Sequence, residues 1–90
     1  HRLKLDDILY IEGMAEYVAF HTRSSGRLLS LMSLKQLEGD LPADRFLRIH
    51  KSYIVASAHV SVLEGNQVVI GKVKLPLGAS YREEVLRRVF

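Results

Sequence analysis

Short apolar and β-branched runs, separated by polar or glycine-containing breaks, fill the first third of the chain and predict strands. The runs with this composition are residues 8–12, 17–22 and 27–32. Residues 23–26 have turn chemistry, and Gly26 can adopt a positive φ, so the second and third runs are predicted to form a hairpin. Residues 13–16 interrupt the first two runs and are predicted to form a loop.

The last third of the chain repeats this pattern. Strands are predicted at residues 60–63, 67–70 and 73–77, with turns at 64–66 and 71–72. The last of these runs alternates apolar and polar residues, which indicates one buried and one solvent-facing side. Pro76 lacks a backbone N–H, so it predicts an edge strand or a strand end.

Two short helices are predicted from their start and stop signals. Ser33 and Gln36 form a capping box, and Gly39 and Pro42 are expected to end this helix after about two turns. Ser80 and Glu83 form a second capping box before a helix predicted over residues 81–89. Its apolar stripe consists of Tyr81, Val85, Leu86 and Val89.

Composition narrows the class of protein. The 90 residues suit one domain, which we expect to span residues 1–90, and 48% hydrophobic with 26% charged residues is ordinary globular composition. Cysteine is absent, which excludes disulfides and thiolate metal sites and fits a cytoplasmic location. No apolar run approaches the roughly 20 residues of a membrane span. The chain starts without Met, so we expect it to be a piece of a longer protein.

The segment 46–55 combines apolar residues with a dense polar cluster. Phe46 and Ile49 look like core anchors, and we expect the segment to form a bend rather than a recognition helix. The polar members, which could face outward as a fixed set of donors, are Arg48, His50, Lys51, Ser52 and Tyr53. Donors held on a rigid base suit an anionic partner, most commonly phosphate.

Signals for catalysis, metals and cofactors are weak, so we expect no enzyme and no cofactor. The chain has no Gly-x-Ser-x-Gly elbow, no His-x-x-x-His spacing and no phosphate-binding glycine loop. A ribonuclease-like pairing of His50 and Lys51 with a second histidine stays open, well behind binding. His21 and His59 are expected to have structural roles.

Nucleic acid is the better-supported partner. The net charge of +3 permits an anionic partner without requiring one. Basic residues recur at 45, 48, 51, 72, 74, 82, 87 and 88, and singly those at 72, 74, 87 and 88 are explained by solubility. The start of the second helix, at Ser80, Tyr81 and Arg82, is a further phosphate site, because free backbone N–H groups point outward there. Plain N-capping by Ser80 is compatible with that role.

Several motifs occur together and in order: residues 7–13, Tyr17 with the strand that it begins, residues 33–38, residues 46–55 and residues 75–84. With these motifs the chain resembles the LytTR DNA-binding domain, the output module of many bacterial response regulators. The resemblance covers about residues 4–89, and its most specific part is the segment 46–55.

The resemblance implies a mostly β, elongated antiparallel fold with two short helices, not a helix-turn-helix. It also implies that three loops enter the DNA grooves, here residues 13–17, 48–53 and 78–82. Members commonly bind paired direct repeats on successive major grooves, so two copies of the domain are needed per site. Glu16 stands where the family often has Asn, and could accept from cytosine N4. The third loop often carries Ser-Arg, and Arg82 could serve instead.

The resulting hypothesis is sequence-specific binding of double-stranded DNA for transcription regulation, by the output domain of a two-component response regulator. A receiver domain is expected N-terminal to this chain, and its phosphorylation would raise homodimerisation and thus avidity. The predicted DNA-binding residues are Glu16, Tyr17, Arg48, His50, Lys51, Ser52, Tyr53, Ser80, Tyr81 and Arg82. Arg48 and Lys51 are expected to contact phosphates or guanine edges. The alternative is a β-rich protein-interaction or ligand-sensing module that binds an acidic partner.

Overall fold

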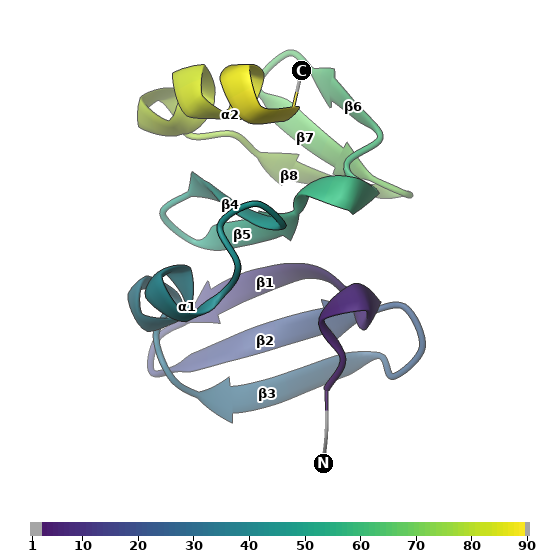
Figure 1. The fold of residues 1–90 in the computed structure, drawn as a ribbon, viewed down its shortest axis with the longest axis vertical. Helices are drawn as coiled ribbons and strands as arrows, with labels where there is room; N and C mark the ends of the chain where they lie inside the picture. The colour runs from purple at the N-terminus through teal and green to yellow at the C-terminus, as the bar shows by residue number, and fades with distance from the viewer. Residues whose placement is uncertain (1–2, 90) are drawn as a thin grey trace.

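The chain folds into two antiparallel sheets, one of five strands and one of three (Figure 1). The hairpin at one edge of the larger sheet lies between the two. The structure, a computed structural model, describes residues 3–89. The five-stranded sheet has the order β3-β2-β1-β5-β4 and consists of β1 (Ile8–Met14), β2 (Tyr17–Thr22), β3 (Arg27–Leu31), β4 (Phe46–His50) and β5 (Tyr53–Ala56). The three-stranded sheet has the order β6-β7-β8 and consists of β6 (Val62–Glu64), β7 (Gln67–Ile70) and β8 (Val73–Pro76).

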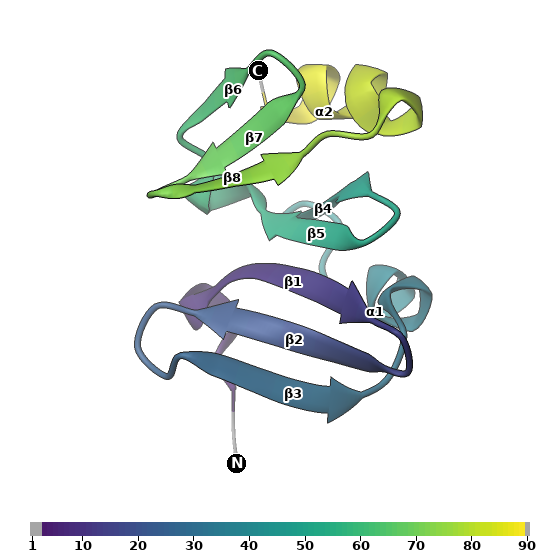
Figure 2. The same cartoon turned by 180° about the vertical axis from the view of Figure 1, so that it is seen from behind.

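Helical segments connect or flank these strands. They are η1 (Leu5–Asp7), α1 (Leu34–Asp40), η2 (Ser57–His59), η3 (Ala79–Tyr81) and α2 (Arg82–Val89). The principal extents are 35 × 24 × 21 Å, so the predicted elongated, mostly β fold with two short helices is confirmed. Figure 2 shows the small sheet and α2 stacked along the long axis beyond the β4–β5 hairpin, with β1, β2 and β3 on the other side of it. Within residues 3–89 there is no helix long and apolar enough to cross a membrane.

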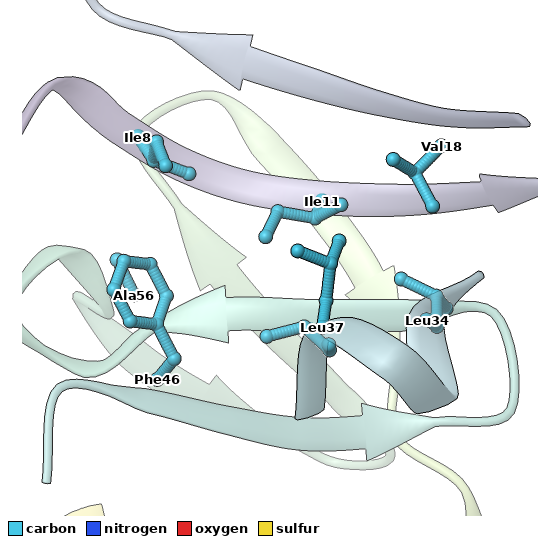
Figure 3. Packing of buried hydrophobic residues seen from close by; sticks show 8 residues of the cluster. Ile8, Ile11, Val18, Leu34, Leu37, Phe46 and Ala56 are labelled. Carbon is cyan, nitrogen blue, oxygen red and sulfur yellow. The ribbon is translucent and has the colours of Figure 1, made fainter. Parts of the chain in front are cut away.

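Two hydrophobic cores share the β4–β5 hairpin. The first core lies between the large sheet and α1, where Leu34 and Leu37 pack among Ile8, Ile11 and Val18 (Figure 3). The second core lies between the hairpin, the small sheet and α2. The hairpin sends Phe46, Ile54 and Ala56 into the first core and Leu47, Ile49 and Val55 into the second. Successive residues of a strand face opposite sides, so both faces of this hairpin are buried.

The prediction that residues 46–55 form a bend is therefore wrong. They form two paired strands with a tight turn at Lys51 and Ser52. A strand buried on both faces reads as a nearly continuous apolar run without a period of two, which hides it from pattern analysis. The expected core positions of Phe46 and Ile49 are confirmed, since both are buried.

The predicted loop at residues 13–16 is also shorter than expected. β1 continues to Met14, and only Ala15, with φ 54°, and Glu16 form the turn. Gly13 lies inside the strand, at a position where α1 packs too closely to leave room for a side chain. A Cβ at Gly13 would lie 2.9 Å from Cδ1 of Leu34, which is closer than real side chains allow.

The helix signals were only partly correct. Oγ of Ser33 accepts a hydrogen bond from the Gln36 N–H at 3.1 Å, so the first N-cap is confirmed. Gly39 does not end α1, which runs to Asp40. Ser80 lies inside η3, and α2 begins at Arg82, so Ser80 is not the N-cap of this helix.

The C-terminal strands follow the prediction with one shift. The strand predicted at 60–63 lies at Val62–Glu64 and is preceded by the unpredicted turn η2. Pro76 is the last residue of the edge strand β8, as its missing N–H predicted.

Candidate nucleic-acid interface

The three predicted contact loops lie along one side of the molecule. The backbone N–H of Gly13 donates to the Ser52 carbonyl at 2.8 Å, which joins the β1–β2 turn to the β4–β5 turn. The backbone N–H of Gly78 donates to the Ile49 carbonyl at 2.8 Å, which joins the β8–α2 connection to the same hairpin. Figures 1 and 2 show these loops on the same side of the molecule, in order along its long axis, with α1 beside the first two. Segments far apart in the sequence thus form one continuous surface.

Gly78 lies close to both the Tyr81 ring and the hairpin. A Cβ at residue 78 would lie 3.0 Å from Cδ2 of Tyr81 and 3.6 Å from the Cα of His50. A side chain at residue 78 would therefore crowd the ring of Tyr81, whereas its distance to His50 is an ordinary van der Waals contact.

Arg48 lies along the outer edge of β4 with its donors turned back onto the hairpin. Its Nε donates to the His50 carbonyl at 2.8 Å, and its Nη2 donates to the Lys51 carbonyl at 2.7 Å. Its Nη1 donates to Oε1 of Glu38, on α1, at 2.6 Å. The guanidinium carbon also lies 6.0 Å from the ring centroid of Tyr81. The sequence correctly placed Arg48 in this segment, but it did not reveal these partners.

His50 organises the turn from its own side chain. Nδ1 of His50 accepts the backbone N–H of Ser52 at 3.0 Å. Neutral imidazole carries one N–H, so the proton of neutral His50 lies on Nε2, which can donate to an acceptor on a ligand. The ring is tilted against Tyr53 with centroids 5.7 Å apart.

Lys51 is exposed at the tip of the β4–β5 turn. It lines an open groove of about 310 Å³ between the first two loops and the start of α1. The groove residues are Gly13, Ala15, Tyr17, Ser33, Leu34, Lys35, Arg48, Lys51 and Ser52. Neither Lys35 nor Lys51 takes part in an ion pair within residues 3–89, so the groove carries two ammonium groups without a carboxylate partner there.

Lys35 is a candidate contact that sequence reasoning missed. It is the second residue of α1 and lies within the motif at residues 33–38, but nothing in the sequence singled it out as a contact. Only the tertiary structure, which brings the start of α1 beside the β4–β5 turn, places it in the groove.

The remaining predicted residues divide by exposure. Glu16 and Ser80 are exposed, and Tyr17 is 45% exposed at the start of β2. Tyr81 is half-buried and packs against the second core. Arg82 donates from Nη1 to the Gly65 carbonyl at 3.1 Å and to Oδ1 of Asn66, and is thereby tied to the β6–β7 turn.

Tyr53 lies beside Glu12 on the face of the large sheet opposite α1. Burial, followed by the negative charge of Glu12, raises the pKa of the Tyr53 hydroxyl above its usual 10.0. The same two causes raise the pKa of Tyr10, whose ring lies 6.3 Å from that of Tyr53. Both phenols are therefore neutral hydrogen-bonding groups at ordinary pH.

His21 and His59 have structural contacts. Nε2 of His21 lies 3.1 Å from Oε1 of Glu12, and its ring stacks on Tyr10 with centroids 4.2 Å apart. His59, in η2, has its Nε2 3.4 Å from the Asp6 carbonyl. In the part of the chain that the structure describes, no cluster of histidine and acidic residues could hold a metal ion.

The profile of the LytTr DNA-binding domain family matches residues 1–89. The chain belongs to this family. The fold of this LytTR domain is also that of a solved LytTr DNA-binding domain from Bacillus cereus, whose parent protein is named as a methyl-accepting/DNA response regulator. The TM-score is 0.87 at 19% identity, and the match covers 97% of this chain and 84% of that one.

One curated relative is similar over part of its length. The CO-responsive transcriptional regulator RcoM of Rhodospirillum rubrum is 43% identical over 53 residues, which are 59% of this chain and 22% of RcoM. The LytTR domain therefore corresponds to a minor part of that regulator. The family assignment and the fold without a helix-turn-helix, both predicted from the sequence, are confirmed.

Proposed function

We propose that this LytTR domain reads double-stranded DNA through the three joined loops, as the output domain of a larger transcription regulator. The observation that carries the proposal is the pair of backbone hydrogen bonds from Gly13 to Ser52 and from Gly78 to Ile49. These bonds hold three loops of separate elements in one fixed surface. A fixed arrangement of donors is what discrimination between DNA sequences requires.

The exposed residues of this surface have distinct roles in the proposal. Lys51 and Lys35 bind phosphates, because an exposed ammonium group is a mobile point charge. Nε2 of His50 donates to a base edge or a phosphate, with Ser52 and Tyr17 beside it. Glu16 accepts from cytosine N4.

The third loop and Tyr53 have supporting roles. Ser80 donates to a phosphate, while Tyr53, Tyr81 and Arg82 act near the contact surface through hydroxyl groups or by fixing the loop. Tyr53 begins β5 directly after the β4–β5 turn, and Tyr81 and Arg82 belong to the third loop.

The domain is also proposed to act in pairs, on direct repeats. A chain of 90 residues offers a small contact surface, so two linked copies would gain affinity from avidity. Homodimerisation through a regulatory domain outside this chain, such as a receiver, would control that gain. The names of the Bacillus cereus and Rhodospirillum rubrum proteins, a response regulator and a transcriptional regulator, support such a role.

Titration of a fluorescent random duplex pool at several salt concentrations tests the proposal. Log K should fall linearly with log salt, as expected when cationic side chains displace the counterions of the DNA phosphates. In vitro selection of bound duplexes should then return a motif repeated in the same direction. Absence of saturable binding at low salt would contradict DNA binding, whereas equal competition by an acidic polypeptide would favour the protein-interaction alternative.

A further inference from the structure

We infer that Arg48 supports DNA binding by holding the β4–β5 turn in its binding shape, and that Glu38 fixes Arg48 in place. Arg48 is then a positioning residue and does not itself touch DNA. The effect of Arg48 on DNA affinity rests on the proposed function. Its effect on the shape of the β4–β5 turn concerns the protein without DNA. The inference reverses the role that the position of Arg48 in a basic cluster suggests.

All three nitrogens of the guanidinium donate to the protein. Arg48 has five N–H groups in a rigid plane, and Nε, Nη1 and Nη2 each make a hydrogen bond of 2.6–2.8 Å. Two of these bonds end on consecutive carbonyls, those of His50 and Lys51. The register of β4 and β5 shifts between Arg48 and His50, so the ladder is irregular where Arg48 bonds. One side chain therefore fixes the path of the backbone that displays His50, Lys51 and Ser52.

The charge of Arg48 is also already balanced. Glu38 accepts from Nη1 at 2.6 Å, and the Arg48 side chain is only 15% exposed. A half-buried, neutralised ion pair attracts a phosphate much less than an exposed ammonium group does. Lys51, exposed at the neighbouring tip and without an ion pair within residues 3–89, is the group that can neutralise a phosphate.

Arg48 connects all three loops through its contacts. It holds the β4–β5 turn directly, and the Ser52 carbonyl of that turn accepts the N–H of Gly13 from the first loop. Its guanidinium carbon lies 6.0 Å from the ring centroid of Tyr81, which belongs to the third loop. Loss of Arg48 should therefore disturb the geometry on which sequence discrimination depends, while leaving the exposed charge unchanged.

The first test uses Arg48→Lys, which keeps the positive charge but cannot make three hydrogen bonds in this geometry. In the free protein, amide hydrogen exchange at Ser52 and Gly13 should accelerate at least about tenfold. Affinity for the selected duplex should fall about tenfold, whereas affinity for unrelated duplexes and the salt slope should not change. Arg45→Lys is the matched control, because Arg45 directly precedes β4, far from the β4–β5 turn, and also pairs with a carboxylate, that of Asp6.

Direct phosphate contact by Arg48 gives the opposite pattern. Arg48→Lys would then retain affinity, while Arg48→Ala would weaken binding to every duplex and reduce the salt slope by about 1. That result, or unchanged amide exchange in Arg48→Lys, would overturn the inference.

Glu38→Ala is a second variant that keeps α1 intact, since alanine favours helices. It releases Nη1 of Arg48 and removes a negative charge near the DNA. The ratio of specific to non-specific affinity should fall severalfold, although the protein becomes more positive. An equal rise in both affinities would show that Glu38 only repels DNA, and would overturn its fixing role.

The two proposals can fail separately. A wild-type domain that binds no duplex overturns the proposed function and, with it, the effect of Arg48 on DNA. Amide exchange in the free Arg48→Lys protein decides the holding role without any DNA present.

Discussion

The imidazole Nδ1 of His50 accepts the backbone N–H of Ser52 at 3.0 Å, across the tip of the β4–β5 hairpin. This bond orients the ring and leaves Nε2 as the donor of neutral His50. A turn that fixes the imidazole in this way presents one donor in one direction. The hydrogen bond thus relates the local backbone geometry to the orientation of the donor that we propose for DNA recognition.

His50→Ala should weaken binding to the selected duplex by about 1–3 kcal/mol, because both the Nε2 donor and the acceptor for Ser52 are lost. Fluorescence anisotropy with the selected duplex measures this loss. His59→Ala is the control, since His59 lies in η2, outside the three joined loops, and pairs with the Asp6 carbonyl. If the two variants bind equally well, His50 does not belong to the interface.

Lys51→Ala should lower affinity for all duplexes alike and reduce the slope of log K against log salt by about 1, because one phosphate contact is lost. The slope is measured by titration at several salt concentrations. Lys72→Ala is the matched control, because Lys72 is exposed in the β7–β8 turn, outside the three joined loops. Relaxed preference at a single base position would instead mean that Lys51 reads guanine.

Much of the fold was predictable where turn residues flank an apolar run at both ends. The strand at residues 17–22 and the strand at 67–70 have the predicted bounds, because glycine-containing or polar turns flank them. The hairpin within 46–56 was not recognised, because both its faces are buried and its side chains therefore show no alternation. Sequence patterns show how far an apolar run extends more readily than how many faces it buries.

The candidate site was predictable only where its residues are adjacent in sequence. His50, Lys51 and Ser52 follow one another, so their cluster was evident. The inward position of Arg48 depends on Glu38, in a different element, and could not be deduced from local composition. Lys35 was missed for the same reason, since it joins the groove only through tertiary contacts.

The free energy of unfolding should decline above pH 10 in part through Tyr10 and Tyr53. Their pKa values are raised in the folded state by burial and by Glu12, so the unfolded chain ionises first. The stability that these neutral phenols contribute is fully present below pH 10 and is lost as the pH rises through the folded pKa values. Urea unfolding from about pH 8 to about pH 11 measures the decline.

Tyr53→Phe should make this alkaline decline smaller, because phenylalanine has no proton to lose. Tyr17→Phe is the control, since Tyr17 is 45% exposed. A decline of the same size in wild type and Tyr53→Phe would assign it to other groups.

Gly13→Ala and Gly39→Ala should change stability in opposite directions, although both positions involve α1. At residue 13 a methyl group would lie 2.9 Å from Cδ1 of Leu34, a buried side chain with little room to move. Gly13→Ala should therefore destabilise the domain by about 1–3 kcal/mol, as expected for overpacking. At residue 39, inside α1, the added methyl group meets no atom within 4 Å, so Gly39→Ala should stabilise the domain by about 0.5–1 kcal/mol. Urea midpoints with an unchanged m value measure both effects. A Gly13→Ala protein as stable as the wild type would mean that α1 can shift away from β1 at little cost in free energy.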